Sequence, residues 1–343
     1  METPDPQHEF AALDPTLIID SVESLGPLSD ARIFPLNSYE NRVYQIGLEE
    51  ISRDGGATAD QTDYGQKIIG KYYRPNRWSD QQILEEHRFT DELAQLEIPV
   101  VTPLQFNQQS LHHYKNFRFA LYPQRGGRTA ELDNPQHLQW IGRFLGRIHL
   151  AGASKAFEHR PHISVQDFAI NSAEYLLTHH FIPDYLLEAY QSLSADLIKV
   201  LKQRFDENSY NAIRLHGDVH RGNILWTEKG PHFVDFDDSR TGPAIQDIWM
   251  LLSGDLLEQQ QQFNHVLDGY FEFAELSNSE LQLIEPLRCL RLMHYASWLA
   301  RRWSDPAFPM NFPWFNTSNY WEQHILELRE QFSLLQENET LHL

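Results

Sequence analysis

Residues 215–225 read Leu-His-Gly-Asp-Val-His-Arg-Gly-Asn-Ile-Leu, and residues 234–238 read Val-Asp-Phe-Asp-Asp. Apolar, strand-like ends bracket a polar loop that holds Asp218 and, five residues on, Asn223. A second carboxylate, Asp235, follows after a short hairpin. Phosphoryl transfer needs a carboxylate beside the acceptor hydroxyl, together with an amide oxygen and a second carboxylate for Mg²⁺. We therefore predict that these two stretches form a phosphoryl-transfer site.

Each of the three polar residues has a predicted role. Asp218 would accept the proton of the attacking hydroxyl and aim its oxygen. Asn223 would give an amide oxygen to Mg²⁺, and Asp235 would reach both the metal and the phosphates. An Asp in a lone His-Gly-Asp is more often a turn residue, but the spacing to the other two favours catalysis. Strand alternation would put Asp237 on the face of Asp235 and Asp238 on the opposite face.

His216 and His220 lie four residues apart, a spacing that also occurs in zinc sites. Gly217 and Gly222 interrupt the segment, so it is not the continuous helix that such a site requires, and the sequence offers no obvious third ligand. We therefore do not interpret the two histidines as a metal site.

The composition is that of an ordinary globular protein, with 41% hydrophobic and 22% charged residues in 343. A net charge of −20 argues against nucleic-acid binding; it would suit a cationic substrate, although solubility alone is the more common reason for it. Cys289 is the sole cysteine, which excludes an internal disulfide. The start has no signal-peptide pattern and no apolar run reaches membrane-spanning length, so we expect a cytoplasmic protein without a membrane partner.

Hydrophobic periodicity predicts strands and one main helix up to Gln124, followed by a mostly helical segment. The expected strands are 32–36, 42–46, 67–73, 110–114 and 117–122, and the expected helices are 15–25, 79–96, 140–149, 172–180, 183–205, 243–257, 260–275, 279–303 and 320–336. Polar residues 49–66 read as an extended hairpin loop. A glycine-bearing hinge near 122–127 would divide the chain into domains 1–124 and 125–343.

Gly65–Lys71 formally fits the phosphate-binding pattern G-x-x-x-x-G-K. That loop continues with Ser or Thr for magnesium and then a helix, whereas Tyr72 follows here and the interior Lys-Ile-Ile is strand-like. We interpret the match as accidental and Lys71 as a strand lysine.

The pattern H-G-D-x-H-x-x-N followed by a hydrophobic residue and Asp resembles the aminoglycoside phosphotransferase and choline kinase superfamily, relatives of protein kinases. Residues 37–44 (Asn-Ser-Tyr-Glu-Asn-Arg-Val-Tyr), residues 242–247 and the aromatic tail 290–315 extend this resemblance to the bacterial stress response kinase A family, over roughly residues 14–321. It implies a two-lobed, protein-kinase-like α+β fold with a small β-rich N-lobe, a larger helical C-lobe and ATP between them. It also implies a protein Ser/Thr acceptor, with autophosphorylation.

The resemblance implies further site residues. Lys71 would contact the α/β-phosphates of ATP, held by Glu86, with Glu85 as the second choice. Asp235 matches the superfamily's metal aspartate. Asp247 matches a structural aspartate that braces the catalytic loop.

The remaining resemblance-based assignments concern the nucleotide and the histidines. Ser38 and Asn41 would replace the usual glycines of the phosphate loop, and Tyr122 would lie in the segment that pairs with adenine. His216 would be a packed residue, and His220 a structural or phosphate-side member of the loop.

Alternatives to a protein kinase remain open. A small-molecule kinase for an amino alcohol such as homoserine or choline would suit the negative charge and the aromatic tail, although those aromatics could equally be helix core. A regulatory ATP-binding module without turnover would not need Asp218, Asn223, Asp235 and Lys71 together. We expect a monomer.

Overall fold

The computed structural model describes residues 9–49, 66–337 and 341–343. The expected hairpin loop 49–66 therefore lies mostly outside the described residues. The chain divides into two compact units, the first comprising Met1–Thr129 with Ile224–Asp237 and the second comprising Ala130–Asn223 with Asp238–Leu343. The sequence-based division differs, because it assigned residues 125–129 and 224–237 to the second domain. That the chain has two functional lobes, which meet near Gln124, stays a prediction.

An antiparallel sheet of five strands, in the order β1-β2-β3-β5-β4, forms the centre of the first unit. Its strands are β1 (Ser29–Pro35), β2 (Arg42–Leu48), β3 (Lys67–Tyr72), β4 (His112–Tyr114) and β5 (Phe117–Pro123). A smaller sheet in the same unit joins β6 (Arg128–Thr129), β8 (Ile224–Thr227) and β9 (Gly230–Phe233). All five strands expected from the sequence are present, with shifted ends.

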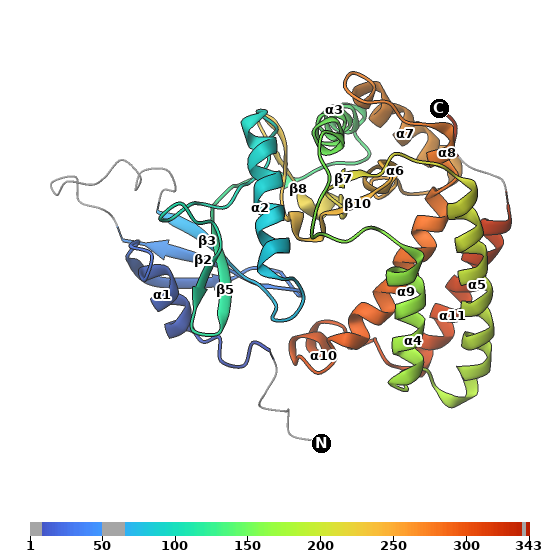
Figure 1. Ribbon diagram of the computed structural model, residues 1–343, viewed down its shortest axis with the longest axis horizontal. Coiled ribbons are helices and arrows are strands. Elements are labelled where there is room, and N and C mark those ends of the chain that lie inside the picture. Colours follow the sequence, from blue (N-terminus) through green and yellow to red (C-terminus); the bar gives the residue numbers. More distant parts are fainter. Residues whose placement is uncertain (1–8, 50–65, 338–340) are drawn as a thin grey trace. The chain divides into compact units, whose positions relative to one another are not determined.

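Two helices cover the faces of the large sheet, α1 (Pro15–Glu23) and α2 (Asp80–Gln95) (Figure 1). Side chains alternate along β3, so Tyr72 packs in the core that includes α1, whereas Tyr73 packs with Ile83 of α2. Lys71 lies two residues before Tyr73, so its side chain is on the same face of the sheet, the face that α2 covers. Ser79 begins α2 with a capping box to Gln82.

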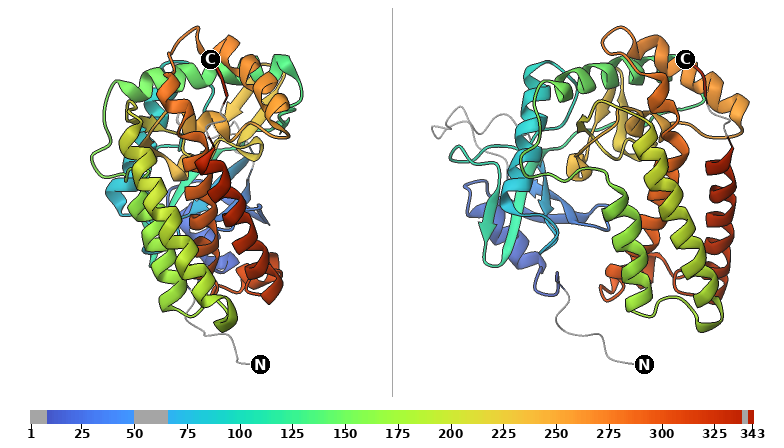
Figure 2. Two further views of the ribbon diagram at one scale, coloured as in Figure 1. Left: turned by 90° about the vertical axis from the view of Figure 1, so that its right-hand side faces the viewer. Right: turned by 45° about the vertical axis from the view of Figure 1, so that its right-hand side comes forward.

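The second unit is mostly helical. Its helices are α3 (Pro135–Ala153), α4 (Asn171–Thr178), α5 (Leu187–Glu207), α6 (Ile245–Trp249), α7 (Leu256–Tyr270), α8 (Asn278–Leu281), α9 (Ile284–Arg301), α10 (Ala307–Asn311) and α11 (Ser318–Gln336), and its short strands are β7 (Ile213–Leu215) and β10 (Arg240–Gly242). Helices α4, α5, α9 and α11 run side by side (Figures 1 and 2). Helix α3 packs on α7, where a Cβ on Gly142 or Gly269 would collide with the backbone of the other helix. No helix in the described segments combines the length and apolar character needed to cross a bilayer.

The expected helix 243–257 is wrong. Helix α6 ends at Trp249, because Gly254 takes a left-handed backbone (φ +89°) and Asp255 begins α7 with a capping box to Glu258. The stretch 279–303 is likewise divided into α8 and α9, and α10 was not anticipated. These corrections shorten the helices but leave the predicted order of a β-rich first part and a helical second part unchanged.

Candidate active site

Lys71 lies at the centre of a buried charge cluster in the first unit. Its ammonium Nζ is 2.9 Å from Asp235 Oδ1, 3.2 Å from Asp237 Oδ1 and 3.7 Å from Glu86 Oε1. Burial alone would lower the pKa of Lys71, but the three carboxylates outweigh it and raise the pKa well above its usual value. The ammonium is therefore charged at neutral pH, and the predicted neighbourhood of Lys71 and Glu86 is present.

Asp235 and Asp237 reach Lys71 by a different route from the one expected. Strand β9 ends at Phe233, Asp235 has a left-handed backbone (φ +60°), and Phe236–Asp238 form a 3₁₀ turn. The two carboxylates lie on the same side, as predicted, but this turn and not strand alternation places them there. The Asp235 side chain is 51% exposed, whereas the Asp237 side chain is 5% exposed. Asp235 is thus the member of the cluster that a ligand can reach.

Arg77 completes the cluster and was missed by the sequence reasoning. Its guanidinium donates a hydrogen bond to Asp237 Oδ2, and its Nε lies 3.6 Å from Glu40 Oε1. The turn that carries Arg77 has no periodic pattern, so no local signal connects it to Asp237. Lys71 thus contacts three carboxylates, and Arg77 joins one of them, Asp237, to Glu40.

Side chains hold the glycine-free loop 37–41 in shape. Ser38 Oγ donates to the Asn41 carbonyl at 3.2 Å, and the Asn41 amide oxygen accepts from the Arg74 backbone N–H at 3.0 Å. The Arg74 guanidinium in turn donates to the carbonyls of Tyr39 and Glu40. Asn41 is 2% exposed, so its amide oxygen is already used inside the fold. A phosphate contact of Ser38 or Asn41 stays a prediction.

Tyr122 lies on β5 with its hydroxyl 3.0 Å from the Tyr73 hydroxyl and 3.5 Å from His87 Nε2. Burial raises the pKa of Tyr122 above its usual value, so the phenol stays protonated. Its place beside adenine stays a prediction.

In the second unit, Asp247 fixes the backbone of the loop that holds Asp218. Its carboxylate accepts the backbone N–H of His216 at 2.9 Å and that of Gly217 at 2.8 Å, as the resemblance predicted. It also contacts His149 Nε2 at 3.1 Å. Gly217 has φ +87°, and a Cβ there would collide with the Asp238 carbonyl, so only glycine fits.

Three side chains converge on Asp218. Arg291 Nη1 lies 2.9 Å from Oδ1, His220 Nε2 lies 3.4 Å from Oδ2, and Asn223 Nδ2 donates to the Asp218 carbonyl at 2.9 Å. Burial alone would raise the pKa of Asp218, but the hydrogen bond from His220 and the Arg291 charge hold it below its usual value. Asp218 is therefore ionised at neutral pH.

The two loop histidines use their ring nitrogens within the loop. His216 is fully buried and its Nδ1 accepts the Asp218 N–H at 3.3 Å, while His220 Nδ1 accepts the Gly222 N–H at 3.0 Å. His216 is the packed residue that the sequence suggested, and His220 supports Asp218. Within the described residues, no three His, Cys, Asp or Glu side chains are grouped as metal ligands.

The aromatic tail is divided between core and surface. Phe308 and Phe315 are buried, whereas Tyr295 is 40% exposed and stacks on Trp298 at a centroid distance of 5.6 Å. Arg291 lies one turn before Tyr295 on α9. Its contact with Asp218 spans 73 residues, and no sequence pattern indicated it.

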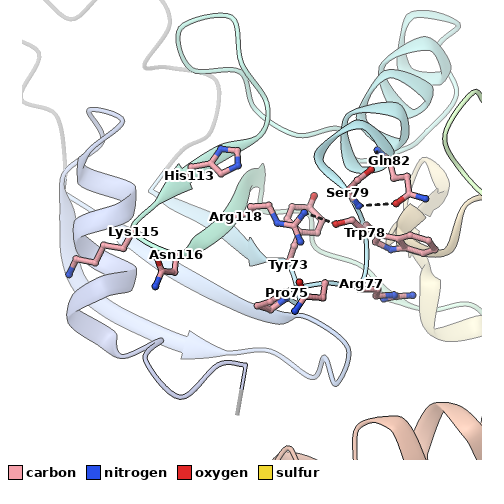
Figure 3. Close-up of a pocket in the computed structure, with 11 residues that line it drawn as sticks. Tyr73, Pro75, Arg77, Trp78, Ser79, Gln82, His113, Lys115, Asn116 and Arg118 are labelled. Atoms are coloured by element: carbon pink, nitrogen blue, oxygen red, sulfur yellow. Dashed lines mark hydrogen bonds between the residues drawn. The ribbon is translucent and has the colours of Figure 1, made fainter. Parts of the chain in front are cut away.

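A separate cavity of about 640 Å³ lies on the first unit, between the turn before α2 and the β4–β5 hairpin (Figure 3). Arg77, Trp78, Lys115 and Arg118 are among its lining residues. The predicted nucleotide-binding residues do not line it. Two of its lining residues contact the Lys71 cluster: Arg77 pairs with Asp237, and the Tyr73 ring centroid lies 5.3 Å from Lys71 Nζ.

Comparison with known proteins decides the family. Residues 33–279 match the sequence profile of the phosphotransferase enzyme family. Stress response kinase A of Escherichia coli O157:H7 is 43% identical over 328 residues, which cover 96% of this chain and 95% of that protein. The chain belongs to the stress response kinase A family. Another relative, from Salmonella typhimurium, bears the name serine/threonine protein kinase RdoA and is 40% identical over the same shares of the two chains.

Solved structures confirm the protein-kinase-like fold that the resemblance implied for this stress response kinase A family member. An amicoumacin kinase in complex with AMP-PNP, Ca²⁺ and Ami aligns with a TM-score of 0.71 at 19% identity, covering 95% of this chain and 96% of that one. A microcompartment-associated aminopropanol kinase aligns with a TM-score of 0.61 at 16% identity, covering 94% and 97%. At these identities the likeness shows the fold alone.

Proposed function

We propose that this protein transfers the γ-phosphoryl group of ATP to a Ser or Thr hydroxyl of a protein, its own chain included. The observation that carries the proposal is the ionised Asp218 in a loop braced by Asp247, with the Asn223 side chain against it. Family membership supports phosphoryl transfer, and the name of the Salmonella relative supports a protein acceptor.

The proposed reaction balances as an in-line displacement. The acceptor oxygen bonds to the γ-phosphorus, the bond from that phosphorus to the β,γ-bridging oxygen breaks, and ADP leaves. Asp218 takes the hydroxyl proton and passes it to solvent. The bonds from Arg291 and His220 fix the direction of the carboxylate. The lowered pKa of Asp218 keeps this carboxylate deprotonated at neutral pH, so that it can accept the hydroxyl proton.

The chain also offers suitable groups for phosphate and Mg²⁺. Lys71 would contact the α/β-phosphates, and Asn223 and Asp235 would hold Mg²⁺. Asp235 is half exposed, and the Asn223 amide oxygen accepts no hydrogen bond from the described part of the chain. Both are the hard oxygen ligands that Mg²⁺ prefers. When bound, the ion would stabilise negative charge on the phosphates.

A labelling experiment tests the proposal. The protein is incubated with γ-labelled ATP and Mg²⁺ alone, with a generic protein acceptor, and with amino alcohols that include homoserine and choline. Asp218→Asn and Asp235→Asn are compared with Asp268→Asn, whose side chain is 65% exposed on α7. We expect label on protein, lost by at least about a hundredfold in the first two variants only. Equal transfer by Asp218→Asn overturns the enzyme proposal, and label only on a small alcohol overturns the protein acceptor.

A further inference from the structure

Arg291 presents unused hydrogen-bond donors next to the proposed catalytic carboxylate. It begins the last three turns of α9, its Nη1 lies 2.9 Å from Asp218 Oδ1, and its side chain is 45% exposed. The sulfur of Met250 lies 4.0 Å from the same nitrogen. A guanidinium carries five N–H groups, and no other acceptor from the described residues meets those of Arg291. Most of its donors are therefore open to a molecule that approaches Asp218.

The surrounding charges favour an anion at these donors. The Arg291 guanidinium already balances the charge of Asp218, and Asp238 Oδ1 lies 3.3 Å from Arg240 Nη2. An ammonium group near the attacking hydroxyl would thus meet a guanidinium, although the chain carries a net charge of −20. A carboxylate or phosphate would meet fixed, charged donors with the fork geometry that suits it.

We propose that Arg291 selects the acceptor by binding an anionic group, a carboxylate or phosphate, that the acceptor carries close to its reacting hydroxyl. The inference rests on the proposed function, because it assigns the acceptor site of the same reaction. A Ser or Thr next to an acidic residue fits this requirement, and so does a small hydroxy acid. Choline and aminopropanol, which carry only positive charge, do not.

Matched acceptors test the inference. Three serine peptides differ only in a Glu, Gln or Lys beside the serine, and N-acetylserine is compared with its uncharged amide. Wild type, Arg291→Gln and Arg291→Lys are measured, with Arg288→Gln as the control. Arg288 lies one turn earlier on α9 and pairs with Glu285 at 2.6 Å, so its loss removes the same charge from the same helix. The peptide and the small-molecule series distinguish the two sources of a carboxylate.

In wild type and Arg288→Gln we expect kcat/KM for the Glu peptide to exceed that for the Gln peptide by about tenfold, mainly through KM. Arg291→Gln would lower transfer to every peptide, because Asp218 loses the bond that orients it, and it would also abolish the preference for the Glu peptide. Arg291→Lys would restore part of this preference, so the ratio between the peptides is the readout. A structural role alone would lower transfer to all acceptors equally.

The outcomes separate the two proposals. An unchanged Glu preference in Arg291→Gln, or no preference in an active wild type, overturns the role of Arg291 and leaves phosphoryl transfer standing. A wild type that transfers no more label than Asp218→Asn overturns both. If only N-acetylserine and its amide accept label, the protein acceptor is wrong, and their ratio still decides the role of Arg291.

Discussion

His149 on α3 and Asp247 on α6 are in contact at 3.1 Å, and both side chains are almost completely buried. The Tyr270 hydroxyl lies 3.0 Å from the other ring nitrogen of His149. Asp247 also accepts two backbone N–H groups of the loop that carries Asp218. One carboxylate therefore connects the loop that carries Asp218 to the α3–α7 helix pair.

Replacing Asp247 with Ala should lower the free energy of unfolding by about 3 kcal/mol, because two buried N–H groups lose their acceptor. Asp247→Asn should cost less, since its amide oxygen can still accept one of them. Urea unfolding measures both, with the exposed Asp268→Asn as the control. A loss for Asp247→Ala no greater than for the control would show that the loop does not depend on this carboxylate.

The acidic limb of the pH profile should report Asp218. Its pKa is held below the usual range despite burial, with Arg291 among the causes, so catalysis should persist to pH values well below neutrality. In Arg291→Gln the pKa of Asp218 rises, and the acidic limb of kcat/KM should move to higher pH. Rates with a neutral peptide from about pH 3 to 8 measure the limb. An unshifted limb in Arg291→Gln, with Arg288→Gln as reference, would contradict this electrostatic coupling.

Removing the ammonium of Lys71 should destabilise the protein by about 3 kcal/mol, because buried carboxylates lose their cation. Glu86→Gln in the Lys71→Met background should recover part of this loss, since it removes one of the buried negative charges. Denaturant midpoints of the single and double variants give the coupling energy. Lys67→Met, at an exposed position of the same strand, is the control. If the stability changes of Lys71→Met and Glu86→Gln simply add in the double variant, the charge cluster is not the cause of the loss.

His324 should make the protein sensitive to acid. Burial lowers the pKa of His324 from 6.5 to about 4, so the ring stays neutral in the folded protein. Between these pH values the unfolded chain binds a proton that the folded protein does not, and stability falls as the pH drops, by up to about 3 kcal/mol. His324→Leu should flatten this dependence in thermal unfolding measured from pH 7 to 4. The exposed His179→Leu should leave it unchanged.

Local patterns predicted much of the fold and the site. Alternation and helical periodicity found the strands of the large sheet and helix α2, and the Asp218-to-Asn223 spacing indicated the catalytic loop. The Lys71–Glu86 contact followed from resemblance, since no local pattern joins a strand lysine to a helix glutamate. Arg77 and Arg291 could not be found, because each meets its aspartate through chain folding across 160 or 73 residues. Strand alternation put Asp237 on the side of Asp235, which is correct, but the cause is the left-handed backbone of Asp235, which alternation cannot predict.

The discontinuity of the first unit has a consequence for biosynthesis. Residues 224–237 supply β8, β9 and two of the three carboxylates around Lys71, yet the ribosome makes them after nearly a hundred residues of the second unit. A nascent chain that has reached Thr129 therefore holds Lys71 beside Glu86 alone, and it lacks β8, which pairs with β6, as well as β9. Residues 1–129 therefore cannot complete their fold while the rest of the chain is still being synthesised. The first unit can be completed only after residues 130–223 of the second unit and then residues 224–237 have been made.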